Sequence, residues 1–395
     1  MSNPTSTTSL TQSPTTTTTT TRSTTAKRQK PHQPDESLLQ NLPDDISQLI
    51  LSLVPPSTLY SVCHSWRRLI YSPSFPPFLS LYALLFSKQT QLQFSSFDPI
   101  SSKWTPLPPP PPNPHLRFRH PSFISRNLPI QSLSVSNNLL VLLAASADHF
   151  LPALTRPLVF NPFTREWSHG PPLHAPRRWC AAGASGGVVY VASGIGSHYN
   201  TDVARSVEKW DVIKNVSTST SHQKGQCPLQ KSWRWEKMGK LKDGKFSREA
   251  IEAVGWRGKL CMVNVKGDVA KEGVIYDVER DVWEGMPEGM LAGWKGPAAA
   301  MEEEILFVVD ESKGLLKRYD DVKDDWVVVV ENCELFKGAE QVVAAGGRVC
   351  VLCGDGVRIA VVDVATPAPG NVRVVDVPSG FQAVTIHVLP RLSCD

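Results

Sequence analysis

Residues 276–283 have the sequence YDVERDVW, and residues 319–326 have the sequence YDDVKDDW. Each segment begins with Tyr-Asp and ends with a Trp six positions after the Asp. The same arrangement occurs earlier as FDPISSKW at 97–104 and as FNPFTREW at 160–167, where Asn replaces Asp. Four copies at one spacing indicate an internal repeat, in which one structural unit is stacked several times.

Two further positions match the repeat less closely. Trp210-Asp211 has its final Trp displaced by an insertion to Trp233 or Trp235, and Val362-Asp363 has no such Trp. The six Asp or Asn positions lie 63, 50, 66, 43 and 43 residues apart. These distances are in the range of four-stranded propeller blades with loop insertions, so the sequence predicts six blades.

A tight turn followed by an apolar strand precedes each of the last five copies. Asn and Gly tolerate the positive φ that two-residue hairpins require, so we expect hairpin turns at these places. The pairs are Asn137-Asn138, Gly186-Gly187, Arg257-Gly258, Glu303-Glu304 and Gly346-Gly347. Glu303-Glu304 occupies its place against the usual turn chemistry.

The repeating unit is strand, glycine turn, apolar strand, loop, strand ending in Asp, turn and Trp-led strand. It resembles the kelch repeat, and its best copy runs from Pro176-Arg177-Arg178 to Val191. Residues 81–107 supply only three strands for the first blade, while a strand pattern at 381–388 is left over. We therefore expect a mainly β fold, a six-bladed kelch-type β-propeller over residues 79–390 whose C-terminal strand 381–388 completes blade one.

The first 37 residues are rich in Ser, Thr and Pro and are expected to be a disordered tail. From residue 38 to 78 the apolar period becomes helical. Ile46, Leu49, Ile50 and Leu53 form one stripe, and a second stripe continues to Ile70. These short helices hold too little apolar area to be stable alone, so the stripes must meet another protein or the rest of this chain.

Leu42-Pro43-Asp44-Asp45-Ile46, Val62-Cys63, Ser65-Trp66-Arg67 and Ser72-Pro73 resemble an F-box in order and residue type. The segment between Pro55 and Val62 is about three residues shorter than usual in that family, roughly one helical turn. The resemblance implies docking onto the Skp adaptor of an SCF-type cullin-RING ubiquitin ligase. It implies these adaptor-binding residues: Leu42, Pro43, Ile46, Leu49, Ile50, Leu53, Leu59, Val62, Cys63, Trp66, Leu69 and Ile70.

Composition excludes several classes of function. Apolar residues make up 41% of the chain, and no apolar run approaches the roughly 20 residues of a membrane span, so we expect a soluble protein without a membrane partner. A net charge of +4 over 395 residues is too diffuse to indicate nucleic-acid binding. The eight cysteines are irregularly spaced and predict reduced thiols, which suits the nucleus or the cytoplasm.

No catalytic or metal motif stands out. Cys350 and Cys353 would face opposite sides of a strand, which disfavours a zinc site. Gly183, Ser185 and Gly187 match a nucleophile elbow in letters, but a strand follows them instead of the required helix. We expect no catalytic residue, no metal and no cofactor, and we expect the repeated Trp104, Trp167, Trp283 and Trp326 to pack between sheets.

Loops at one mouth of the propeller are the candidate target site. Arg178, Arg248, Lys295 and Lys337 stand 9, 10, 9 and 10 residues before their hairpin turns, so they are expected to converge on one face. With Arg177, Trp179 and Arg205 they suggest a basic ring for an acidic or phosphorylated segment. The alternative is that these residues are ordinary solvated loop charges.

Together the two resemblances imply the substrate-recognition subunit of a ubiquitin ligase, which binds a target for ubiquitination and has no active site of its own. One alternative is a kelch scaffold or interaction protein that is not attached to a ligase. A less favoured one is a propeller sugar oxidase, which needs a copper site of Tyr and His with a crosslinking Cys. Only seven Tyr and scattered His residues argue against that enzyme.

Overall fold

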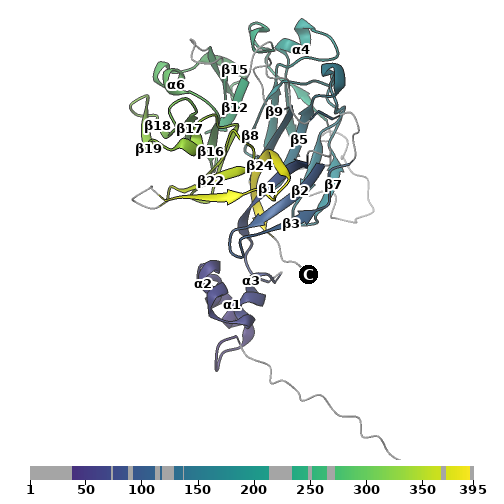
Figure 1. Ribbon diagram of the computed structural model, residues 1–395. Helices are drawn as coiled ribbons and strands as arrows, with labels where there is room; N and C mark the ends of the chain where they lie inside the picture. Colours follow the sequence, from purple (N-terminus) through teal and green to yellow (C-terminus); the bar gives the residue numbers. More distant parts are fainter. Residues whose placement is uncertain are drawn as a thin grey trace, which may run out of the picture.

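The computed structural model describes residues 38–72, 74–87, 92–111, 116–117, 129–136, 138–212, 234–247, 251–264, 272–365 and 371–391. The Ser/Thr-rich tail predicted over 1–37 lies outside these ranges. Three short helices at the N-terminal end precede a ring of β-sheets, and the helices lie below the ring in Figure 1. No helix in the described ranges is both long enough and apolar enough to cross a membrane.

The described strands form six antiparallel sheets of four strands each, so the predicted six-bladed propeller is confirmed. Blade one contains β24 (Phe381–Arg391), β1 (Phe78–Ser87), β2 (Leu92–Asp98) and β3 (Lys103–Leu107). Blade two contains β4 (Ile130–Val135), β5 (Leu139–Ala145), β6 (Leu158–Asn161) and β7 (Glu166–His169). Blade three contains β8 (Ala181–Ser185), β9 (Val188–Ala192), β10 (Val207–Asp211) and β11 (Glu236–Lys237).

The last three blades follow the same order. Blade four contains β12 (Ile251–Trp256), β13 (Lys259–Asn264), β14 (Gly273–Asp277) and β15 (Val282–Gly285). Blade five contains β16 (Ala298–Met301), β17 (Ile305–Asp310), β18 (Leu315–Asp320) and β19 (Asp325–Val330). Blade six contains β20 (Gln341–Ala345), β21 (Arg348–Leu352), β22 (Arg358–Asp363) and β23 (Val372–Asp376).

The ring closes through its last strand, as the leftover strand pattern predicts. β24 pairs with β1 along its whole length, from Phe381 opposite Ser87 to Arg391 opposite Phe78. It is the innermost strand of blade one and packs against the inner strands β20 and β4 of the neighbouring blades. Closure in this way pairs the edge of β1 that would otherwise face the axis of the ring.

The hairpin turns have the backbone that the glycine pairs predict. Gly186, Gly187, Gly258, Gly346 and Gly347 all have positive φ, whereas Asn137 lies outside the described residues. In blade five the turn residues are Glu302 and Glu303, with φ of 47° and 60°, so this turn begins one residue earlier than expected.

The contacts of Glu302 and Glu303 explain why glutamates occupy this turn. The Glu302 carboxylate accepts the Gly346 N–H of blade six at 2.7 Å, and the Glu303 carboxylate accepts the Gly186 N–H of blade three at 2.8 Å. These bonds tie three turns together across the mouth of the ring. Contacts with other blades therefore offset the strained turn, because each carboxylate satisfies a backbone donor.

Repeated tryptophans join neighbouring blades. Each indole N–H donates to a backbone carbonyl of the preceding blade or of the connection that leaves it, and each ring lies against an aromatic residue of its own third strand. The five donors and acceptors are Trp104 to Asp376, Trp167 to Pro108, Trp235 to Pro171, Trp283 to Gly239 and Trp326 to Met290. Trp235 occupies the place of the displaced Trp in blade three, because its ring packs on Trp210, and Trp233 lies outside the described residues.

The two faces of the ring carry different segments. Hairpin turns between first and second strands and between third and fourth strands lie on one face, called here the lower face. Connections between blades lie on the other, upper face, with the helices α4 (Thr201–Arg205) and α6 (Glu288–Gly293), which lie near the top of Figure 1, and the 3₁₀ turns η1 (Asp148–Phe150), η2 (Lys245–Ser247) and η3 (Glu334–Phe336).

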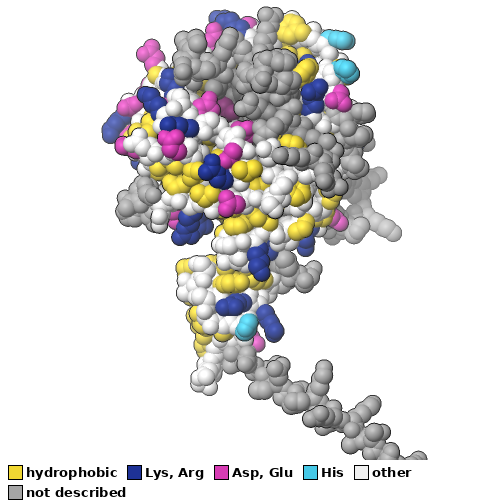
Figure 2. Space-filling model, in the orientation of Figure 1, with side chains coloured by type: hydrophobic (Ala, Val, Ile, Leu, Met, Phe, Trp, Pro, Cys, Tyr) yellow, Lys and Arg dark blue, Asp and Glu magenta, His cyan; other side chains and the backbone are white. Residues whose placement is uncertain are grey.

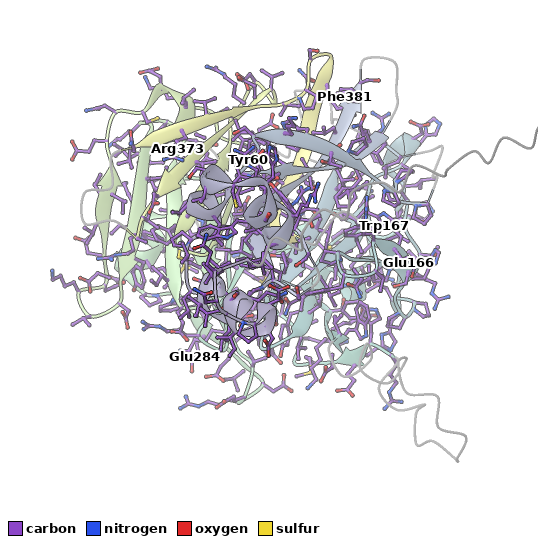
Figure 3. The ribbon with its side chains drawn as sticks, turned by 90° about the horizontal axis from the view of Figure 1, so that it is seen from below. Tyr60, Glu166, Trp167, Glu284, Arg373 and Phe381 are labelled. Atoms are coloured by element: carbon purple, nitrogen blue, oxygen red, sulfur yellow. The ribbon has the colours of Figure 1, made fainter. Side chains whose placement is uncertain are left out.

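The N-terminal helices attach to the lower face, because β1 is a second strand and starts there. They are α1 (Asp44–Ser52), α2 (Pro56–Val62) and α3 (His64–Ile70). Their own small core contains Leu51, Leu59, Leu69, Ile70 and Phe75. In the view from below, the helix residue Tyr60 overlies the middle of the ring and Glu284 lies toward its rim (Figure 3).

Candidate functional site

The first candidate surface is the outer face of the helices. The stripe predicted on α1 is exposed: 68% of Leu49 and 82% of Leu53 are open to solvent, and Leu42, Ile46 and Ile50 are exposed as well. Val62 of α2 is 55% exposed, and Pro43 and Cys63 also lie at the surface. Hydrophobic side chains are visible on the surface of this unit below the propeller in Figure 2. A helix that turns its apolar stripe to solvent indicates a protein-binding surface.

Other predicted adaptor-binding residues lie inside the helical unit. Leu59 is fully buried, and Leu69 and Ile70 are buried beside it. Trp66 is half-buried, and its indole N–H donates to the Leu38 carbonyl at 2.9 Å. These four residues hold the helices together, so they support the exposed face without forming it. Both groups have the same helical period in sequence, and therefore the period alone does not separate them.

A polar cluster fixes the helices to blade one. The Tyr71 hydroxyl donates to Asp98 at 2.6 Å, and Asp98 also accepts the Ser101 hydroxyl and the Ile100 N–H. The Arg391 guanidinium lies 5.6 Å from the centre of the Tyr71 ring. Burial and the Asp98 carboxylate raise the pKa of Tyr71. Although burial opposes it, the hydrogen bonds from Tyr71, Ser101 and Ile100 lower the pKa of Asp98, so this carboxylate stays charged.

The second candidate surface is the upper face of the propeller. Arg177, Arg178 and Trp179 lie on the connection from blade two to blade three, Lys295 on the connection from blade four to five, and Lys337 on that from five to six. Arg205 ends α4 on the same face. Arg248 lies outside the described residues.

Most of these cations are already engaged. Arg177 is 1% exposed and forms an ion pair with buried Glu208, which also accepts from His174. Arg205 donates to the Leu241 carbonyl at 2.9 Å, and Lys337 pairs with Glu334 at 2.6 Å. Lys295 is half-buried. Arg177 therefore stabilises blade three and does not present a free cation to a target.

A cavity of about 770 Å³ runs between the inner strands of the blades. Its lining includes five glutamates, Glu252, Glu302, Glu303, Glu311 and Glu340, but no Lys or Arg of the described ranges. Those of the predicted basic residues that are described lie on the upper face and do not line this cavity. Binding of a target by these cations stays a prediction, and the cavity itself is lined by acidic side chains.

Sequence reasoning missed two partners on the upper face. The Arg178 guanidinium lies 3.9 Å from the centre of the Trp179 ring. The Trp179 and Phe150 ring centres are 5.9 Å apart, and the Arg117 guanidinium lies 4.8 Å from the centre of the Phe150 ring. Phe150 lies in a loop of blade two and Arg117 on the connection from blade one to blade two, and neither segment has repeat periodicity. The closed ring brings these segments beside Trp179, and the repeat pattern does not indicate which loop residues will meet there.

Two observations on the described side chains bear on metal binding and on nucleophilic chemistry. Within the described ranges no three His, Cys, Asp or Glu residues gather as metal ligands would. Burial raises the pKa of the Cys350 thiol to about 12 and that of the Cys353 thiol to about 11. Thiols with such pKa values stay protonated at neutral pH, so they are poor nucleophiles and poor metal ligands.

Comparison with known proteins agrees with this architecture. None of the protein-family models matches the chain. The chain is 51% identical over 373 residues to the F-box/kelch-repeat protein SKIP25 of Arabidopsis thaliana, covering 91% of each. It is 25% identical over 291 residues to the F-box protein AFR of the same plant, covering 70% of this chain and 69% of that protein. Six four-stranded blades, three N-terminal helices and this identity show that the chain belongs to the F-box/kelch-repeat protein family.

Proposed function

We propose that this protein is the substrate-recognition subunit of an SCF-type cullin-RING ubiquitin ligase. Its N-terminal helices bind the Skp adaptor, and its propeller binds a target protein. The observation that carries the proposal is the exposed apolar face of α1, which remains unpaired although the helices have a core of their own and are fixed to blade one. Membership of the F-box/kelch-repeat family supports it.

The division of the two faces suits this task. The helices attach to the lower face, while connections with Arg178 and Trp179 lie on the upper face, so adaptor and target do not compete for one surface. Such a subunit needs no catalytic residue, because holding a target near the conjugating enzyme raises its effective concentration. The six free cysteines of the described ranges suit the reducing nucleus or cytoplasm.

The test is capture of the Skp adaptor and cullin by the full-length protein. Leu49→Glu/Leu53→Glu places two charges on the exposed face of α1 without touching the helical core, and we expect it to lose both partners. Val322→Glu is the matched control, because Val322 is 91% exposed on the propeller. We expect this control to bind like the wild type.

Failure of the wild type to capture the adaptor would reject the ligase proposal. It would favour the kelch scaffold, in which the shorter segment between Pro55 and Val62 no longer supports docking. Equal capture by the double variant and the wild type would show that the adaptor binds elsewhere.

A further inference from the structure

Four side chains form a continuous stack on the upper face, at the junction of blades two and three. In order they are Arg117, Phe150, Trp179 and Arg178, with neighbouring groups 4.8, 5.9 and 3.9 Å apart. We call them the cation–aromatic stack. Phe150 and Trp179 are both half-buried, and the next residue along, Leu151, is 42% exposed. The stack therefore combines an apolar surface with a guanidinium at each end.

The two guanidinium groups differ in their surroundings. Arg117 lies 3.7 Å from the carboxylate of Asp148, which is 65% exposed. Arg178 is only 9% exposed, and its Nε and Nη1 have no hydrogen-bond partner among the described residues. Burial lowers the pKa of Arg178. The charge of this guanidinium is therefore poorly compensated from within, and a carboxylate placed at its exposed edge would compensate it.

The backbone beneath the stack is held in a costly conformation. His149, Phe150 and Trp179 all have positive φ, between 55° and 57°, which is unusual for residues other than glycine. The backbone N–H of Trp179 donates to the side-chain oxygen of Gln131 at 3.1 Å, and this bond helps to fix the residue whose indole lies over Arg178. Bulky residues in this conformation are found preferentially where a ligand is held, so the strain agrees with a binding role.

The charge of the cavity beside the stack determines where an acidic ligand can lie. Gln131 lines the cavity as well as holding Trp179, so the stack is at the cavity's edge. Three of its glutamates, Glu252, Glu311 and Glu340, lie at strand ends on the upper face, whereas Glu302 and Glu303 belong to a lower-face turn. A negatively charged segment is therefore repelled from the axis of the ring and attracted to the cations over blades two and three.

We propose that the cation–aromatic stack binds an acidic segment of the target protein. A carboxylate of that segment pairs with Arg178, and a neighbouring apolar or aromatic side chain packs on Phe150 and Trp179. This proposal rests on the proposed function, because it names the class of target that the ligase subunit recognises.

The test is selection of binders by the full-length protein from a displayed library of random peptides. We expect the selected peptides to carry Asp or Glu next to Phe, Trp or Leu. Arg178→Met and Trp179→Ala should each weaken the binding of a selected peptide at least tenfold, and Phe150→Ser provides a third variant at a half-buried position in case either of these fails to fold. Lys240→Met removes a cation whose side chain is 58% exposed and should leave the affinity unchanged.

Selection of Lys- or Arg-rich peptides that Arg178→Met does not affect would overturn the proposal and point to the acidic cavity instead. A lack of any enrichment for acidic residues would also overturn it. Adaptor capture is measured on the same wild-type preparation. Intact capture without acidic peptides rejects the stack alone, whereas acidic peptides without capture reject the ligase proposal alone.

Discussion

At the scale of single residues, Trp326 shows how one side chain joins two blades. Its ring packs on Tyr319 within blade five, and its indole N–H donates to the Met290 carbonyl at 3.0 Å. Both Trp326 and Met290 are buried, so the carbonyl has no ready access to water. The indole thus provides both packing and the partner of a buried acceptor.

Two substitutions separate these contributions. Trp326→Phe keeps an aromatic ring but leaves the Met290 carbonyl unpaired, so we expect the free energy of unfolding to fall by about 1–3 kcal/mol. Trp326→Ala also leaves a cavity and should cost about 3–5 kcal/mol. Chemical denaturation of both variants measures the difference. If the Phe variant is as stable as the wild type, the indole hydrogen bond contributes nothing.

Asp324 gives a pH dependence with a definite sign. It accepts the Tyr319 hydroxyl at 2.6 Å and the N–H groups of Gly289 and Met290. These hydrogen bonds, that of Tyr319 foremost, lower the pKa of Asp324 below its ordinary value. A lowered pKa means that the stabilisation is complete above pH of about 4 and is lost as the pH falls through the folded-state pKa.

We therefore expect Asp324→Asn to lower the melting temperature at pH 7, with a difference from wild type that shrinks below pH of about 4. Thermal unfolding followed from pH 7 to about pH 2.5 measures this difference. A difference that stays constant over this range would show that the charge of Asp324 does not contribute.

The repeat predicts the packing of individual residues well where one structural position recurs. The tryptophans that end five of the six repeats lie between neighbouring blades as expected, because large aromatic residues repeated at one structural position serve the core. Glu302 and Glu303 could not be predicted, since their partners are turns of other blades. Arg177 looks like a loop cation in sequence, but it forms a buried ion pair with Glu208, which is 31 residues away.

At the scale of elements, the inner strands approach one another closely. A Cβ added at Gly255 of β12 would lie 1.8 Å from the Ala184 carbonyl oxygen of β8. This separation is far shorter than any real contact, so only glycine allows blades three and four to meet there. The backbone of β8 cannot move aside as a flexible side chain would.

We expect Gly255→Ala to lower the free energy of unfolding by at least about 1–3 kcal/mol, because the added methyl group forces two strands apart. Gly285→Ala is the matched control: Gly285 ends β15, and a Cβ there meets nothing within 4 Å. We expect that control to stay within about 0.5 kcal/mol of the wild type. Equal melting temperatures for both variants would contradict the close approach.

Periodicity predicts the N-terminal helices and the strands, but not which partner covers a helix. Ile46, Leu49, Ile50 and Leu53 form a clear stripe that is compatible with a buried face or a docking face. The structure shows it exposed, with Leu51 on the buried side. One apolar stripe defines a face of a helix, whereas the packing of neighbouring helices decides whether that face points inward.

At the scale of the whole molecule, the propeller depends on β24. Nine consecutive residues of this strand from Ala383 to Arg391 are buried, and they complete the inner edge of blade one. Deletion of residues 381–395 should open the ring and expose the edge of β1 together with apolar surface of blades one and six. Deletion of residues 392–395 alone is the control and leaves β24 whole.

We expect the longer deletion to cause aggregation in size-exclusion chromatography and rapid cleavage by dilute protease, whereas the control should behave like the full-length protein. A compact, protease-resistant product of the longer deletion would contradict the role of β24 in closure. This closure is well predicted by sequence, because a count of the strands leaves the first blade with three strands and leaves one strand after the last repeat.

The position of β24 in the sequence also means that the ring can close only late in translation. The helices are translated before β1, and every other described strand of the ring is translated before β24, the inner neighbour of β1. During translation the apolar inner edge of blade one therefore stays without its partner. A messenger cut short before the codons for β24 would yield a chain with the exposed apolar face of α1 and an open ring, a product that cellular quality control can distinguish from the finished protein by its exposed edge.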